Sequence, residues 1–236
     1  MNAIDENISA RSGYYVSLVT AITTIITFGI AFMTPPLSGP FCVAGCFEYP
    51  YSEIASRFPR DYYWMYLAIV VTILFVIQMI IVNNIAGSKV KIFSHTGVAF
   101  SIISATILIS NYFTQVSVVQ PSLLNGETEG IALLTQFNPH GIFIALEEIG
   151  FLLMTFAFFV TIPVFAKKGG VYKAVRLTYL IGFLLGIASL VYISIKLGTG
   201  REYIFEVIII SIVWLELIIT SFLLSVIFKR VYNSKH

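Results

Sequence analysis

The residues best able to do chemistry are four ionisable side chains in a chain that is otherwise strongly apolar. Glu147 and Glu148 are adjacent in the stretch FNPHGIFIALEEIGF, and His140 precedes them in the same stretch. Glu216 lies alone in a second apolar run. Carboxyl and imidazole groups can hold a cation or transfer a proton. Ionisable groups are costly to bury in a membrane, so those found there are candidate functional residues.

Membrane helices are the elements that must position these side chains. The 236 residues are 58% hydrophobic and 11% charged, with a mean hydropathy of +0.90, whereas soluble domains carry about 25% charged residues. A helix needs roughly 20 apolar residues to cross a bilayer. The sequence predicts an all-α integral membrane protein, a single bundle of six transmembrane helices over 14–34, 62–82, 92–112, 139–165, 174–197 and 203–228.

The distribution of basic residues predicts how the bundle is threaded. Ten of the fourteen Lys and Arg residues fall at the chain ends or in alternate loops: Arg11, Lys89, Lys91, Lys167, Lys168, Lys173, Arg176, Lys229, Arg230 and Lys235. Basic residues near helix ends resist translocation, so we expect a cell-membrane protein with both termini in the cytoplasm. The net charge of +2 reflects this cytoplasmic rim. Membrane lipids are the expected partners, and nucleic acid is not.

The first of two external loop segments, 35–61, contains both cysteines of the chain. Cys42 and Cys46 face the oxidising side in this topology, where a local disulfide is expected. Two reduced cysteines remain the alternative. A four-thiolate metal site would require a second cysteine pair, which the chain lacks, so no metal is expected.

The second external segment, 113–138, leads into the helix that carries the glutamate pair. It predicts a break at Pro121, a turn at Asn125 and a short amphipathic helix over 127–136. Asn138 followed by Pro139 predicts a helix start.

That predicted start sets the depth and direction of the two glutamates. Glu147 would lie about 12 Å into the membrane. Consecutive helical residues diverge by about 100°, so Glu147 and Glu148 would point to different neighbours. His140 would share a face with Glu147, because seven residues make about two turns.

Polar residues on other helices complete the candidate site. The third helix has a stripe at Ser101, Ser104, Leu108, Asn111 and Gln115, which we interpret first as a helix-packing face. Glu216 is expected near mid-membrane, whereas Glu206 is expected to be solvated or paired with Arg201. Gly182 and Gly186 form G-x-x-x-G, which permits close helix approach. The candidate ligand-binding residues are Asn111, Gln115, His140, Glu147, Glu148 and Glu216.

No motif assigns an activity to these residues. The glutamate pair resembles the E-E-x-x-x-R motif of intramembrane glutamate proteases, but Leu152 occupies the arginine position and no F-x-x-x-H follows, so this assignment is rejected. Serine-hydrolase, zinc-protease and P-loop motifs are absent, and no cofactor is expected.

Three functions are compatible with the sequence. The first is binding or transport of a small solute or lipid in an externally open pocket between the third, fourth and sixth helices. The second is a membrane-embedded enzyme acting on a lipid-soluble substrate, with His140 and a glutamate as acid and base. The third is an accessory subunit without chemistry.

Overall fold

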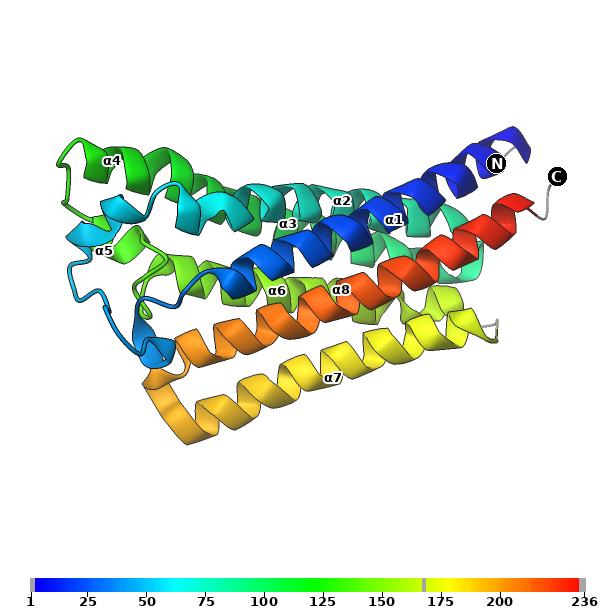
Figure 1. The fold of residues 1–236 in the computed structure, drawn as a ribbon. Coiled ribbons are helices and arrows are strands. Elements are labelled where there is room, and N and C mark those ends of the chain that lie inside the picture. The colour runs from blue at the N-terminus through cyan, green and yellow to red at the C-terminus, as the bar shows by residue number, and fades with distance from the viewer. Residues whose placement is uncertain (1–2, 167–168, 234–236) are drawn as a thin grey trace.

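Six long helices run roughly along one axis in the computed structural model, which describes residues 3–166 and 169–233 (Figure 1). No strand occurs within these ranges. Each of the six helices is long and apolar enough to cross a membrane. They are α1 (Ala3–Met33), α2 (Tyr63–Ile85), α3 (Lys91–Thr114), α6 (Ile142–Thr161), α7 (Val171–Leu197) and α8 (Glu202–Asn233).

The two ends of the bundle differ in what they carry. Both chain termini lie at one end, which we call the terminal end, and the longer connections lie at the other, which we call the loop end (Figure 1). At the terminal end α1 and α8 are in close contact, because a Cβ on Gly13 would lie 2.7 Å from the ring of Phe228. A larger residue than glycine would push these helices apart there.

The third helix extends beyond the predicted boundary at 112. From α3 it continues through a π-helical turn, Gln115–Val119, into α4 (Gln120–Leu124). Pro121 does not break it, because proline lies in the first turn of α4, where its missing amide is tolerated. The wider π turn precedes it without interrupting the helix. The second loop is therefore shorter than predicted.

The connection after α4 also differs from the prediction. Only α5 (Ile131–Leu134) is α-helical in the expected 127–136 segment. The next long helix begins at Ile142 rather than Pro139. The side-chain oxygen of Asn138 accepts a hydrogen bond from the His140 amide at 3.0 Å, and its Nδ2 donates to Ala132 at 2.7 Å. Asn138 therefore holds a turn, not a helix cap.

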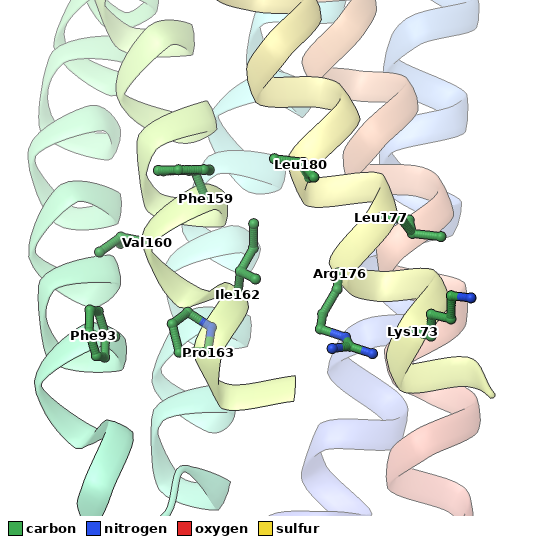
Figure 2. A pocket seen from close by; sticks show the side chains of 9 residues that line it. All are labelled: Phe93, Phe159, Val160, Ile162, Pro163, Lys173, Arg176, Leu177 and Leu180. Carbon is green, nitrogen blue, oxygen red and sulfur yellow. The ribbon is translucent and has the colours of Figure 1, made fainter. Parts of the chain in front are cut away.

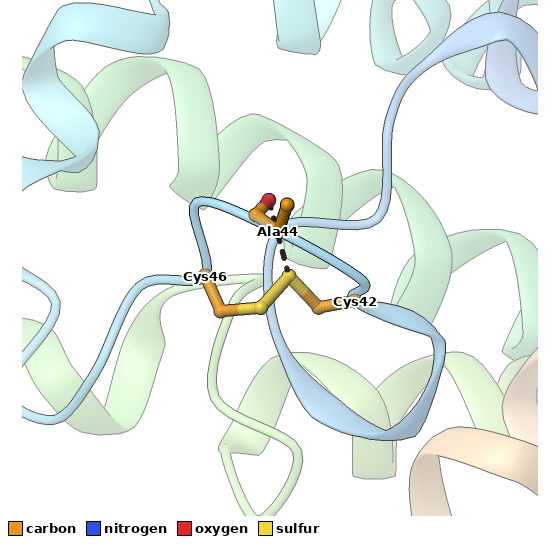
Figure 3. Close-up of a disulfide and its surroundings, with 3 residues drawn as sticks. All are labelled: Cys42, Ala44 and Cys46. Atoms are coloured by element: carbon orange, nitrogen blue, oxygen red, sulfur yellow. Dashed lines mark hydrogen bonds between the residues drawn. A yellow bond between two sulfur atoms is a disulfide. The ribbon is translucent and has the colours of Figure 1, made fainter.

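The first connection contains three short 3-10 turns and one disulfide. The turns are Gly39–Phe41, Ser52–Arg57 and Arg60–Tyr62. Cys42 and Cys46 are bonded, with Cα atoms 5.9 Å apart, and the Cys42 sulfur lies 3.8 Å from the Ala44 carbonyl oxygen (Figure 3). The Phe47 amide donates to the Leu37 carbonyl at 2.7 Å. The disulfide and this hydrogen bond thereby close the loop on itself.

The polar stripe of α3 packs against α6, which confirms the helix-packing interpretation. Ser104 donates to the Gly150 carbonyl at 2.7 Å, and Asn111 donates to the Phe143 carbonyl at 2.9 Å. Leu108 fits against Gly150, where a Cβ would lie 2.6 Å from the leucine side chain. These contacts fix α6, and with it the glutamate pair, against α3.

Candidate functional site

Two carboxyl groups from different helices meet near the loop end of the bundle. Glu147 of α6 is 0% exposed and Glu206 of α8 is 7% exposed. Their carboxyl groups are neighbours, and Oε2 of each has no hydrogen-bond partner among the described residues. Two carboxylates side by side repel each other, so a proton on one of them stabilises the pair. The pair can therefore hold a proton, or a cation that replaces it.

Neighbouring side chains orient the two glutamates of α6 in different directions. The hydroxyl of Tyr112 on α3 donates to Glu147 Oε1 at 2.7 Å. Glu148 turns toward α8, where its Oε2 lies 2.9 Å from Nη1 of Arg201. The divergence expected from helix geometry is thus confirmed.

The expectation for Glu206 was wrong. Arg201, five residues earlier, pairs with Glu148 instead. Glu206 is neither solvated nor ion-paired with Arg201 but buried beside Glu147. The sequence placed Glu206 near the helix end, where water is expected. The connection that follows α1 covers this end and excludes it from bulk solvent.

Glu206 also lines a cavity of about 380 Å³ between α1, α2, α6 and α8. The Thr34–Leu37 segment and Phe41 form its outer wall. One face of α8 supplies several lining residues at helical spacing: Tyr203, Glu206, Ile210 and Trp214. The cavity therefore has an acidic group in a mostly apolar wall.

Aromatic rings make up much of this wall. Trp214 lies with its ring centroid 5.5 Å from that of Phe28 and 6.3 Å from that of Trp64. Phe41 approaches Tyr203 at 6.0 Å. Ring faces attract cations through their quadrupole, most strongly for tryptophan. Rings together with a carboxyl group form the chemistry that recognises an organic cation.

Asn111 and Gln115 serve the framework and do not line this cavity. Gln115 donates to the Leu134 carbonyl at 2.6 Å and accepts from the Gln136 amide at 3.0 Å, so it ties α5 to the end of the third helix. The cavity lies between α1, α2, α6 and α8, whereas the pocket was expected between α3, α6 and α8.

His140 does not share a helix face with Glu147, contrary to the expectation. It is exposed and lies in the turn before α6. Because the helix starts at Ile142, the two-turn spacing that would have aligned the residues does not exist.

Glu216 is deeply buried but separate from the cavity. It is 3% exposed, and neither carboxyl oxygen has a hydrogen-bond partner among the described residues. The carboxyl group occupies the notch left by Gly182 of α7, where a Cβ would overlap it. This confirms that the G-x-x-x-G pattern permits close approach.

Sequence reasoning missed four residues of the cavity. Trp64, Tyr203 and Trp214 were not among the candidate residues, and Glu206 was expected to be solvated or paired with Arg201. In the sequence, aromatic and acidic residues recur on one face of the segment 203–214. This pattern indicates a cavity wall only when the helices that pack against that face are known.

Comparisons with known proteins assign no function to this geometry. Comparisons of the chain with known protein families, curated proteins and solved structures found no match. Within residues 3–166 and 169–233, no three His, Cys, Asp or Glu side chains are arranged to hold a metal ion. The cavity and its carboxyl pair are therefore the features of the molecule that point to a function.

Proposed function

We propose that this protein binds a small organic cation in the cavity at the loop end and acts as a transporter for it. The observation that carries the proposal is the position of Glu206. Its carboxyl group lines an aromatic-walled cavity and contacts the carboxyl group of Glu147. A protonated amine or quaternary ammonium group would find its counter-charge and its ring contacts in one place.

A proton and the ligand would compete for the same carboxyl group. A proton on one of the two groups relieves the repulsion between the neighbouring carboxyl groups of Glu147 and Glu206. A cation entering beside Glu206 supplies positive charge in place of that proton. Binding is then coupled to proton release, which is a step that a proton-exchanging transporter needs.

The charge distribution at the loop end supports a cationic ligand. Four basic residues fall there, Arg57, Arg60, Lys196 and Arg201, against nine of the twelve acidic residues of the chain. Of these acidic residues, Glu48, Glu53, Glu127 and Glu129 are exposed, and an excess of acidic residues raises the local concentration of cations. The nine are Glu48, Glu53, Asp61, Glu127, Glu129, Glu147, Glu148, Glu202 and Glu206.

We further propose that the loop end faces outward from the cell membrane and that both termini are cytoplasmic. The excess of Lys and Arg at the terminal end supports this orientation, as does the disulfide at the loop end. The cavity would then be reached from outside the cell.

Replacing Glu206 by glutamine tests the ligand assignment. The Glu206→Gln variant is expected to bind benzyltrimethylammonium about ten-fold or more weakly, because an interaction with a charged partner contributes roughly 1.5 to 3 kcal/mol. Isothermal titration of the purified protein measures this change.

Glu127→Gln is the matched control, because it removes an exposed acid at the same end. The control is expected to bind as the wild type does. An equal loss of affinity in both variants would mean that only the general surface charge attracts the cation. Unchanged affinity in Glu206→Gln would contradict binding in this cavity.

Single cysteines test the orientation in intact cells. The two native cysteines are bonded to each other, so a thiol reagent that cannot cross membranes labels only an introduced cysteine. Cysteine at the exposed Asn125 should be labelled from outside, and cysteine at the exposed Lys89 only after the membrane is permeabilised. The reverse pattern would invert the proposed threading.

A further inference from the structure

A second and larger cavity, of about 570 Å³, lies near the terminal end between α3, α6 and α7 (Figure 2). Its lining is mostly apolar, from Phe93, Phe159, Ile162, Pro163 and Leu180. Lys173 and Arg176 of α7 also line it. The cavity therefore combines an apolar wall with two positive charges.

A proline near the connection of α6 and α7 shapes this groove. The α-helix of α6 ends at Thr161, and a tighter 3-10 turn, Ile162–Phe165, follows with Pro163 in its first turn. Proline cannot donate the backbone hydrogen bond that would continue the α-helix. Further into the bundle, the rings of Phe159 and Phe183 stack at 4.1 Å. This stacking holds the Phe159 ring in the wall of the groove.

Arg176 offers unused hydrogen-bond donors to the groove. Its Nη1 donates to the Ala166 carbonyl at 3.1 Å, while its Nε is buried without a partner among the described residues. Figure 2 shows its guanidinium group between α7 and the Ile162–Phe165 turn. A guanidinium fork suits the oxygens of a phosphate group. Lys173, one turn earlier on α7, adds a second charge at this end.

We propose that this groove binds one anionic phospholipid, with its phosphate on Arg176 and Lys173 and an acyl chain along the apolar wall. The site lies at the end that carries most of the basic residues of the chain. That end faces the cytoplasmic leaflet in the proposed threading, and anionic lipids attract basic groups at that surface. The proposal depends on membrane placement and is independent of the ligand in the cavity at the loop end.

Lipid titration of the purified full chain in neutral detergent tests the site. Phosphatidylglycerol is expected to raise the thermal unfolding temperature in a saturable manner, and phosphatidylcholine with the same chains is not. Lys173→Gln and Arg176→Gln should each weaken the apparent affinity for phosphatidylglycerol about five-fold, the factor expected for one basic side chain at an anionic lipid surface. Leu180→Trp, which fills the groove without changing its charge, should weaken it as well.

Two controls separate this site from general attraction to the basic rim. Lys89→Gln and Arg230→Gln remove exposed charges at the same end and should leave the affinity unchanged. Glycerol phosphate, which has the phosphate but no acyl chain, should not stabilise the protein. Equal effects of all four charge variants, equal stabilisation by phosphatidylcholine, or full stabilisation by glycerol phosphate would each overturn the proposal.

Discussion

Replacing Gly150 with alanine is expected to destabilise the protein by about 1 to 3 kcal/mol, the usual cost of overfilling a packed interior. A Cβ at this position would lie 2.6 Å from Cγ and Cδ2 of Leu108, which is fully buried. The branched leucine cannot rotate away without displacing its neighbours. The change should also disturb the Tyr112 to Glu147 hydrogen bond, because α3 and α6 hold these residues. Thermal unfolding of the purified variants measures the loss.

A second substitution and a control make this prediction specific. Leu108→Ala should recover part of the stability when combined with Gly150→Ala, because it makes room for the added methyl group. Gly29→Ala adds the same group to another long helix, at a position with nothing within 4 Å, and should not lower stability, because alanine favours a helix over glycine. An equal effect at both glycines would contradict the packing of α3 on α6.

Replacing Arg201 with glutamine is expected to cost about 2 kcal/mol. Loss of one partner from a buried ion pair typically costs 3 to 5 kcal/mol, but the Arg201 side chain is 27% exposed, so water screens part of the effect. The Glu148 carboxylate, which is buried, would lose a cation that now lies 2.9 Å away. The expected result is a lower unfolding temperature for Arg201→Gln.

The matched variants for this ion pair are Lys196→Gln and Glu148→Gln. Lys196 is an exposed basic residue of the same end, and its replacement should have little effect. Glu148→Gln should restore stability when combined with Arg201→Gln, since no unpaired carboxylate remains. A double variant less stable than Arg201→Gln alone would show that the pair is not the source of the loss.

Sequence patterns predicted the helical class and the positions of the six long helices because each helix carries its own apolar run. The boundaries at Pro121 and Asn138 were less predictable. Pro121 was expected to break the chain within an external loop, yet it occupies the first turn of α4, where proline is tolerated. Asn138 was expected to cap a helix, yet its side chain holds a turn with Ala132 and His140. In both cases the neighbouring backbone decides between two local structures.

The candidate site was only partly predictable because it depends on contacts between distant helices. Glu147 and Glu148 were found from their cost in an apolar segment, and their divergence followed from helix geometry. Glu206 could not be paired with Glu147 from sequence, because 59 residues separate them and the loop after α1 covers them. Asn111 appeared suited to a ligand but instead donates to the backbone of α6.

The most direct test of the proposed cation site uses the protein's own fluorescence. Trp64 and Trp214 are the two tryptophans of the chain, and both line the cavity. Titration with benzyltrimethylammonium and with neopentylbenzene compares a cation with a neutral compound of the same shape. We expect a saturable fluorescence change with the cation and little change with the neutral compound at equal concentrations. Equal responses to both, or no saturable response to the cation, would contradict the proposal that the carboxyl pair selects a positive charge.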